Sequence, residues 1–184
     1  AINTSYYDFS PSISADGSTL YYMSDRPGGY GGNDLWVSTR PSADAEWGAP
    51  VNLGPVVNSE KAEGTPSIAA DGLTLFFSDW GDPRPGGQGS VDLWVTTRPT
   101  KDDQWGKPVN LGPTVNSSSS EEQPSISADG LTLFFTSDRT GGSGNLDLWM
   151  TTRASLSDPW DPPVNLSWQV NSSSGEWGPS ISVD

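Results

Sequence analysis

The chain contains neither cysteine nor histidine, and both absences restrict its chemistry. Without cysteine there can be no disulfide, no thiol nucleophile and no thiolate metal ligand. Without histidine there can be no Ser-His or Cys-His pair, no imidazole metal ligand and no imidazole base that titrates near neutral pH. Catalysis would have to rest on carboxylate, Tyr, Lys or Arg side chains.

Positive charge and long apolar runs are also scarce. Nine Lys and Arg stand against 23 Asp and Glu, which gives a formal net charge of −14. This balance disfavours nucleic acid as a partner and favours divalent cations. No run of 18 apolar residues is present, so no membrane span is expected. No signal peptide is visible either, and one that existed would have been removed. The absence of cysteine suits an extracellular, cell-surface or periplasmic protein.

The sequence is rich in turn residues and aromatics. It holds 21 Gly and 16 Pro, while nine Trp, five Tyr and five Phe supply bulky core material. This combination indicates tight turns around a packed core rather than a disordered chain. One domain with its own core is expected at this length.

The sequence repeats itself with a long period. The run Pro-Ser-Ile begins at Pro11, Pro66, Pro124 and Pro179, so the spacings are 55, 58 and 55 residues. The middle copy carries three extra residues in its Gly/Pro-rich loop, where an insertion is tolerated. The single domain, residues 1–184, is therefore divided into repeats 3–57, 58–115 and 116–170 and a partial repeat 171–184.

Each repeat predicts four short strands. PSIS is the first, and the Asp-Gly that follows suits a tight hairpin. The second, LTLFFTS, is apolar on both faces, which indicates burial on both sides. DLWVTTR is the third, and the fourth lies around PVNLG. Because no stretch shows a sustained 3.6-residue apolar period, the chain is predicted to be all β.

Four-stranded units at this spacing are typical of β-propeller blades. One blade cannot bury both of its faces, so each must pack on the next. We predict three four-stranded antiparallel blades plus the first strand of a fourth, an incomplete ring because propellers usually have four to eight blades. Six of the nine Trp recur at positions suited to blade packing: Trp36, Trp47, Trp94, Trp105, Trp149 and Trp160.

The third repeat reads PSISADGLTLFFTSDRTGGSGNLDLW and then WDPPVNLSWQVNS. This resembles the WD-like β-propeller repeats of the TolB type, in the bacterial subgroup with PSIS-x-DG-x-TL-x-F-x-SDR-x-GG-x-G-x-x-DLW. The resemblance covers the whole chain. It implies a periplasmic or surface protein that acts as a binding or scaffolding module. Oligogalacturonate lyases of the wider superfamily are enzymes, but they rely on histidines that are missing here.

The loop GGxGxxDLW resembles the calcium-binding nonapeptide of parallel β-helices, although its Asp comes one residue late and its period is far longer. We interpret it as a turn whose Asp accepts backbone N–H groups. A calcium hypothesis stays open, because acids from two loops of each blade are expected on one face. The candidate ligands are Asp25, Asp34, Asp79, Asp92, Asp138, Asp147, Glu63, Glu121 and Glu176.

The Ser-Asp-Arg triplets at residues 24–26 and 137–139 predict an Asp–Arg ion pair that holds a loop, rather than a catalytic site. Every recurring acid is present in each blade, whereas a single active site normally breaks the repeat symmetry. We therefore expect no enzyme activity. A carboxylate-only glycan hydrolase or lyase is a distant alternative.

Four sequons lie in turn-rich segments, where a glycan could be attached if the loops are exposed. Such triplets arise by chance in Ser-rich turns, so modification is not the default expectation. The candidate glycosylation sites are Asn3, Asn116, Asn165 and Asn171.

Aromatic residues that do not repeat are the most informative about function. One repeat position holds Phe9 and Trp177 in the two terminal copies but Gly64 and Glu122 in the internal copies. Aromatics confined to the ends favour end-specific contacts, as at a protein–protein interface; the alternative is that they only plug the ring closure. The interface candidates are Tyr6, Tyr7, Phe9, Trp168 and Trp177, and the ligand candidates are Tyr30 and Trp80.

Residues 1–16 match residues 169–184 in register, so both end blades are expected to expose unpacked surface. Three explanations stay open: a piece of a longer propeller, a six-bladed ring of two chains, and end-to-end joining into a filament. The leading hypothesis is a non-enzymatic extracytoplasmic scaffold that associates with itself. The alternative is a propeller that binds glycan or cell-wall fragments through its acidic loops and unique aromatics.

Overall fold

The computed structural model describes residues 2–81 and 84–181, and within this part every regular element is a β-strand. No helix in these two ranges is long and apolar enough to cross a membrane. Across the described residues, twelve strands form three four-stranded antiparallel sheets. The first sheet contains β1 (Asp8–Ile13), β2 (Thr19–Ser24), β3 (Asp34–Thr39) and β4 (Val51–Asn52). The second contains β5 (Ala62–Ile68), β6 (Thr74–Trp80), β7 (Leu93–Thr97) and β8 (Val109–Asn110). The third contains β9 (Glu121–Ile126), β10 (Thr132–Ser137), β11 (Asp147–Thr152) and β12 (Val164–Asn165).

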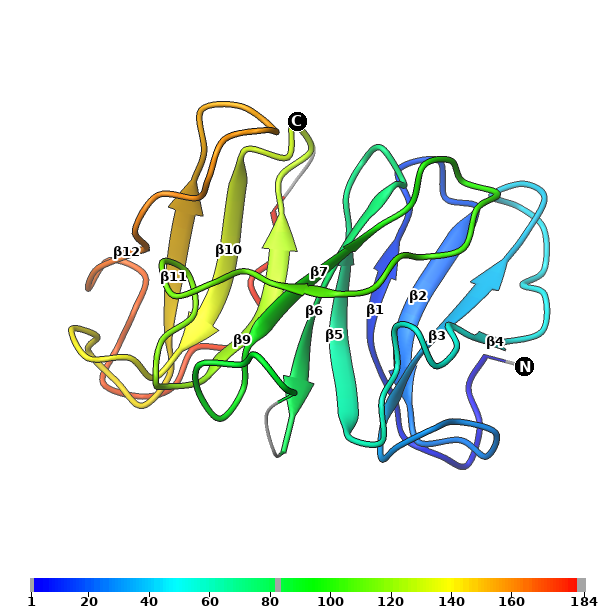
Figure 1. The fold of residues 1–184 in the computed structure, drawn as a ribbon, viewed down its shortest axis with the longest axis horizontal. Coiled ribbons are helices and arrows are strands. Elements are labelled where there is room, and N and C mark those ends of the chain that lie inside the picture. Colours follow the sequence, from blue (N-terminus) through cyan, green and yellow to red (C-terminus); the bar gives the residue numbers. More distant parts are fainter. Residues whose placement is uncertain (1, 82–83, 182–184) are drawn as a thin grey trace.

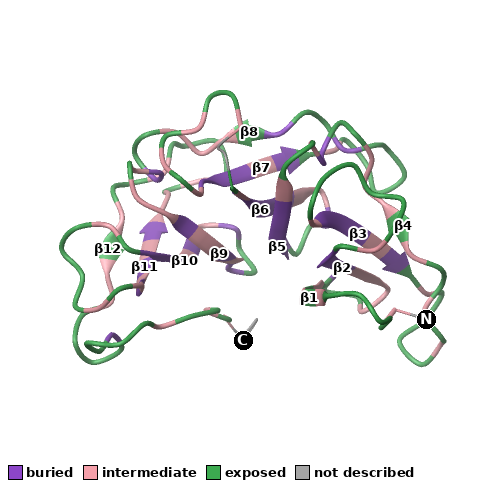
Figure 2. Cartoon of the chain, turned by 90° about the horizontal axis from the view of Figure 1, so that it is seen from below, coloured by how far each residue is buried: buried purple, intermediate pink, exposed green. Residues whose placement is uncertain are grey.

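Each sheet is a meander, and the three sheets stand side by side along the molecule (Figure 1). Seen from the direction of Figure 2, they form an arc with β1, β5 and β9 on its inner side. The outer strands β4, β8 and β12 are only two residues long. The predicted all-β propeller with an incomplete ring is therefore confirmed, and each sheet lies within one of the predicted repeats.

The inner strand of each blade begins before the PSIS run that predicted it. In β1 the pairing with β2 is interrupted between Phe9 and Ser12, and β5 and β9 carry the same bulge. The residue before each proline adopts a positive φ, at 51° for Ser10, 49° for Thr65 and 53° for Gln123. Positive φ is uncommon for residues other than glycine, and it marks functional sites more often than ordinary strands.

The serine of each of the first three Pro-Ser-Ile runs bonds its blade to the segment that follows. Its hydroxyl accepts the backbone N–H of the isoleucine in the next run, so the repeated tripeptide is explained by a contact between repeats rather than within one. The three bonds are Ile68 N to Ser12 Oγ (3.0 Å), Ile126 N to Ser67 Oγ (3.2 Å) and Ile181 N to Ser125 Oγ (3.3 Å).

Two apolar clusters fill the spaces between blades. Tyr21 and Leu35 of the first blade pack with Ile68 and Leu75 of the second. The equivalent residues Phe76 and Leu93 of the second blade pack with Ile126 and Leu133 of the third. Burial of such side chains contributes roughly 1.5–3 kcal/mol each, so the contacts between blades stabilise the fold.

The C-terminal segment occupies the place of a fourth inner strand. Gly178 donates its N–H to Oε1 of Gln123 (2.5 Å), and Ile181 donates to Ser125, so residues 178–181 run beside β9. Up to Ile181 the segment pairs with no second strand. The remainder of the predicted PSIS strand, from residue 182 onward, lies outside the described residues.

Candidate functional site

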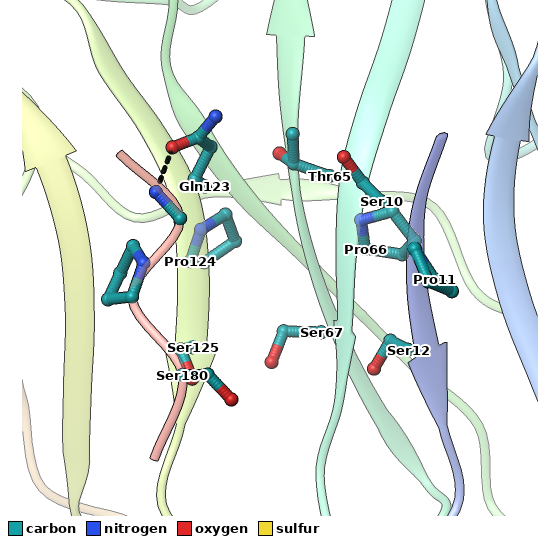
Figure 3. A pocket seen from close by; sticks show the side chains of 12 residues that line it. Ser10, Pro11, Ser12, Thr65, Pro66, Ser67, Gln123, Pro124, Ser125 and Ser180 are labelled. Atoms are coloured by element: carbon teal, nitrogen blue, oxygen red, sulfur yellow. Dashed lines mark hydrogen bonds between the residues drawn. The ribbon is translucent and has the colours of Figure 1, made fainter. Parts of the chain in front are cut away.

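The inner edges of the blades surround a polar cavity of about 280 Å³ (Figure 3). All four copies of the Pro-Ser anchor line it, together with the residue before each proline. Figure 3 shows the anchors of β1, β5 and β9 and of the C-terminal segment around this space. Because its Pro and Ser residues repeat in every blade and its serines bond between blades, most of this lining is explained by the fold.

A second cavity of about 600 Å³ shares three residues with the first and has a different character. Its wall combines aromatic and thioether side chains with amides, hydroxyls and one carboxylate. We call it the aromatic cavity. It is lined by Tyr7, Phe9, Ser10, Met23, Asp25, Gly32, Asn33, Thr65, Trp80 and Gln123.

Hydrogen bonds fix two parts of the aromatic cavity. Tyr7 and Phe9 form a stacked pair with ring centroids 5.7 Å apart and planes 15° apart. The Tyr7 backbone N–H donates to Oδ1 of Asp25 (2.8 Å). On the second blade, Trp80 Nε1 donates to the Ser78 hydroxyl (2.8 Å), which also bonds the Thr65 hydroxyl (2.7 Å). The indole is therefore held by its N–H.

The positions that line the aromatic cavity are those at which the repeats differ. Trp80 of the second blade stands where the first and third blades carry Asp25 and Asp138. Polar Asn33 of the first blade stands where the second and third carry Val91 and Leu146. At each of the other lining positions the three blades carry three different residues. In the order first, second and third blade, these are Tyr7, Ala62 and Ser120; Phe9, Gly64 and Glu122; Ser10, Thr65 and Gln123; Met23, Ser78 and Thr136; and Gly32, Ser90 and Asn145.

The sequence prediction placed Tyr7 and Phe9 in an interface and Trp80 in a ligand site, yet the structure brings all three into one cavity. Tyr30, the other ligand candidate, is half exposed on its loop and does not line it. Ser10, Met23, Asn33, Thr65 and Gln123 were not predicted. Three of them, Ser10, Thr65 and Gln123, could have been found from the sequence, because the residue before the proline differs between repeats while Pro-Ser-Ile itself is constant.

The remaining interface candidates lie away from the aromatic cavity. Tyr6, Trp168 and Trp177 are all exposed, and Trp168 is the most exposed at 78%. Trp168 follows β12 on the third blade. A role for these three residues in an interface stays a prediction.

The aspartate at or just before the start of each third strand serves its glycine-rich turn, as interpreted from the sequence. Asp34 accepts N–H groups of Tyr30 (2.6 Å) and Gly31 (3.2 Å) and the side-chain amide of Asn52 (2.8 Å). Asp92 and Asp147 accept the equivalent loop N–H groups in the other blades.

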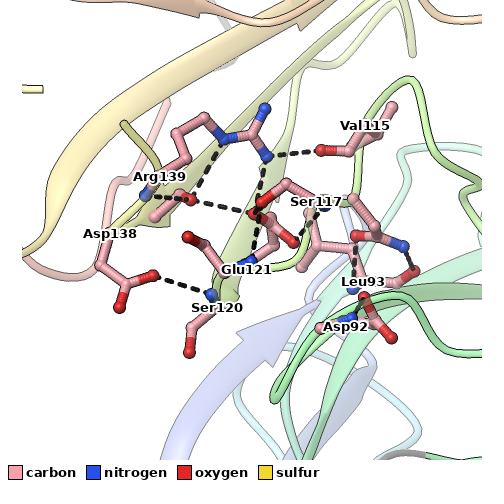
Figure 4. A network of polar contacts seen from close by, with 12 residues as sticks. Asp92, Leu93, Val115, Ser117, Ser120, Glu121, Asp138 and Arg139 are labelled. Carbon is pink, nitrogen blue, oxygen red and sulfur yellow. Dashed lines mark hydrogen bonds and ion pairs between the residues drawn. The ribbon is translucent and has the colours of Figure 1, made fainter. Parts of the chain in front are cut away.

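The predicted Asp–Arg pair within each Ser-Asp-Arg triplet is wrong. Arg26 pairs with Asp8 (2.5 Å) instead of Asp25, and Arg139 pairs with Glu121 (2.9 Å) instead of Asp138 (Figure 4). Both the Asp and the Arg of each triplet lie just after the second strand ends, and the arginine reaches the acid that starts the neighbouring inner strand, Asp8 in β1 and Glu121 in β9. Asp25 and Asp138 instead accept backbone N–H groups from the loop between blades, at Tyr7 and Ser120.

The second blade supplies the same ion pair from its insertion. Arg84 Nη2 lies 2.7 Å from Oε1 of buried Glu63, although Arg84 is not in a Ser-Asp-Arg triplet. Each of the three arginines also lies over two aromatic rings; for Arg84 these are Phe77 (5.3 Å) and Trp94 (5.6 Å). The equivalent pair of rings is Tyr22 and Trp36 for Arg26, and Phe135 and Trp149 for Arg139.

The carboxylates proposed as calcium ligands are largely engaged by protein donors. Burial raises the pKa of Asp92 despite the loop N–H groups of Gln88 and Gly89, and the charges of Asp79 and Glu121 add to the increase. In the described ranges no group of three or more acids is placed to hold a metal ion. The calcium site stays a prediction, and its test is whether a chelator lowers the melting temperature.

Three of the four sequon asparagines have a buried amide nitrogen, the atom to which a glycan would be attached. Asn116 and Asn171 use Nδ2 twice, in bonds to the backbone of the third strand and to the Asn that follows the fourth strand's valine. Nδ2 of Asn165 is buried without a partner in the part of the chain described. Asn3 is exposed and keeps its status as a candidate.

No protein-family model matches the chain, and no curated protein does. Solved structures do match the chain. TolB from Acinetobacter baumannii has a TM-score of 0.57 and 14% identity over 85% of this chain and 32% of its own. A putative TolB from Agrobacterium tumefaciens has a TM-score of 0.58 and 15% identity over 97% of this chain and 56% of its own. The chain thus spans between a third and just over half of these proteins, and it shares a TolB-type propeller fold with them.

The expectation that the chain has no enzyme activity is wrong, because enzymes are among the structures with a similar propeller fold. An α-L-arabinofuranosidase from Lactobacillus brevis is similar to the chain, with a TM-score of 0.54 and 14% identity over 88% of this chain and 54% of its own. A propeller of this kind is therefore compatible with an enzyme, and the repeat symmetry on which the exclusion rested is broken at the aromatic cavity.

Proposed function

We propose that the chain is an extracytoplasmic propeller module that associates with a second copy of itself, the first blade of one copy packing on the third blade of the other. The observation that carries this proposal is the exposure of Ile13. Its equivalents Ile68 and Ile126 are 9% and 8% exposed because each meets the preceding blade, but Ile13 is 51% exposed. An isoleucine that exposed on a blade face favours a partner surface.

The opposite end of the arc carries the matching surface. Phe134 and Leu148 of the third blade are partly exposed. The equivalent Phe76 and Leu93 of the second blade are 2% and 0% exposed, because Ile126 and Leu133 cover them. The third blade thus offers the surface that an Ile13-bearing blade face is built to cover.

An aromatic contact between consecutive blades supports the same arrangement. Tyr21 meets Trp105 edge to face at 6.0 Å, and Phe76 meets Trp160 in the same way at 6.3 Å. The next members of this series are Phe134, on the third blade, and Trp47, on the first. A head-to-tail pair would complete the third contact.

The C-terminal segment supports a copy of this chain as the occupant. Residues 178–181 repeat residues 10–13 and already lie where the inner strand of a following blade belongs. Two hydrogen bonds from this segment to side chains hold it there, whereas β1 is held by a backbone ladder to β2. We expect β1 of a second copy to displace this segment from its place beside β9. Two chains then make six blades, within the usual range of closed propellers.

The test is the mass in solution of the 1–184 chain, measured by light scattering after gel filtration. A two-chain ring is expected at about 39 kDa, twice 19.5 kDa. Ile13→Glu is expected to give 19.5 kDa, because it places a charge in the contact. Val109→Glu, at an apolar and even more exposed position on β8 of the middle blade, is the matched control and is expected to leave the mass unchanged.

A mass of 19.5 kDa for the parent chain at every concentration would overturn the proposal. That result would leave blades of a longer polypeptide as the occupant of the two surfaces. Masses that increase steadily with concentration would replace the two-chain ring by an open filament, since a head-to-tail contact that does not close continues indefinitely.

A further inference from the structure

We infer that the aromatic cavity binds a neutral carbohydrate, a short stretch of oligosaccharide whose sugar rings lie against Tyr7, Phe9 and Trp80. The inference does not depend on the association of two copies, because one chain supplies every residue that lines the cavity.

The first argument is the loss of repetition at this place. Packing between blades needs the same residue types in each blade, and the isoleucines, leucines and third-strand tryptophans meet that need. The lining of the aromatic cavity departs from the repeat at every position, and Asp25 and Trp80 occupy one position in successive blades. Residues that packing does not require, gathered in one cavity from three blades, indicate a ligand site.

The second argument is the aromatic wall. Tyr7 and Phe9 are 67% and 51% exposed, although each is large and apolar. Trp80 has its Nε1–H occupied by Ser78, so its ring rather than its donor is available to a ligand. Rings of this kind accept the C–H faces of sugars, which are apolar on the face and polar at the rim.

The third argument is the polar complement. The side-chain amide of Asn33 and the hydroxyl of Ser10 line the cavity and make no hydrogen bond within the described part of the chain. Gln123 uses Oε1 for Gly178, which leaves its NH₂ group for a ligand, and Asp25 uses only Oδ1. Hydroxyl groups both donate and accept, so a sugar can bond to amide, hydroxyl and carboxylate together.

Charge selects among the ligands that aromatic walls accept. The net charge of −14 and the Asp25 carboxylate in the wall disfavour acidic sugars, phosphates and nucleic acid. A quaternary ammonium group would suit aromatic rings beside a carboxylate. Such a group would leave Asn33, Ser10 and Gln123 without hydrogen-bond partners. The cavity volume of about 600 Å³ also suits a ligand larger than a single ammonium group. A neutral oligosaccharide uses both sets of groups.

The test is isothermal titration of the intact chain with cellohexaose, xylohexaose and chitohexaose, with 3′-sialyllactose and tetramethylammonium as comparators. At least one neutral hexasaccharide is expected to bind with a Kd below about 1 mM. Trp80→Ala and Phe9→Ala are each expected to weaken that binding by about tenfold or more. Tyr30→Ala, an exposed aromatic outside the cavity, is the matched control and is expected to bind like the parent.

Three results would overturn the inference: no neutral hexasaccharide binding below about 1 mM, binding by Trp80→Ala equal to that of the parent, or binding of tetramethylammonium or sialyllactose alone. Circular dichroism and the mass in solution of each variant separate a loss of fold or of association from a loss of binding. Ile13→Glu, which tests association, is expected to keep sugar binding because Ile13 does not line the cavity.

Discussion

Arg139 places its Nη2 atom 2.9 Å from Oε1 of Glu121, a carboxylate that is fully buried. The same nitrogen donates to the backbone carbonyl of Val115, which lies in the connection between β8 of the second blade and β9 of the third. The pair therefore links the second-strand loop, the inner strand and the connection between blades (Figure 4). In its equivalents, Arg84–Glu63 and Arg26–Asp8, Nη2 of the arginine likewise donates to a backbone carbonyl of the segment before the inner strand, at Val57 and Ile2.

Arg139→Ala is expected to destabilise the chain by about 3–5 kcal/mol, because it leaves the buried Glu121 carboxylate without its cation. The free energy of unfolding from urea denaturation measures the change. The control is Lys101→Ala, which removes a 3.0 Å pair with Asp16 at an exposed site and is expected to cost less than about 1 kcal/mol. Equal losses in the two variants would contradict a structural role for the buried pair.

Stability is expected to depend on Asp8 in acid. Burial by itself raises the pKa of Asp8, but hydrogen bonds from Ser24, Arg26 and Thr4 outweigh it and hold the pKa at about 2. Because the folded-state pKa is lowered from 3.8, the carboxylate stabilises the fold above about pH 4, and this contribution is lost as the pH falls toward 2.

Asp8→Asn is the variant that tests this dependence. Its melting temperature is expected to lie below that of the parent by a constant amount at neutral pH, and the gap is expected to narrow between about pH 4 and pH 2. Asp44→Asn, at an exposed loop position, serves as the control. A gap that does not change with pH would show that the substitution acts through packing alone.

The third glycine of each GGxG loop is expected to tolerate no side chain. A Cβ at Gly31 would lie 1.7 Å from the backbone oxygen of Lys61, and the equivalent glycines Gly89 and Gly144 meet backbone oxygens at 1.9 Å. Gly31→Ala is expected to cost at least about 2 kcal/mol, because a backbone rather than a flexible side chain must move. The neighbouring Gly32→Ala meets only Ala62 Cβ at 3.6 Å and is expected to change stability by less than about 0.5 kcal/mol. Urea denaturation of both variants provides the comparison.

Removal of residues 177–184 is expected to strengthen association, because residues 178–181 occupy the place beside β9 that β1 of a second copy would take. The measurement is the concentration at which half of the chain is assembled, which should fall relative to the full chain. The same truncation combined with Ile13→Glu should stay at the mass of one chain. If the truncation weakened the assembly, residues 178–181 would instead form part of the contact between two copies.

Sequence by itself determined the blades. The spacing of Pro11, Pro66 and Pro124 revealed the repeat, and the alternation of turn residues with apolar runs revealed four strands in each copy. These features can be read locally, since a strand needs only its own side-chain pattern and a hairpin needs only its turn. The turn role of Asp34 was predictable for the same reason, because it acts on residues three and four positions before it.

Only the tertiary structure decided which residues act together across blades. Arg84 takes the role of Arg26 although it lies in an insertion, because the loop brings its guanidinium back over Phe77 and onto Glu63. Tyr7 and Trp80 meet in one cavity although they belong to different repeats. Their approach depends on the angle between successive blades, which is set by packing of the whole interface and has no local signature in the sequence.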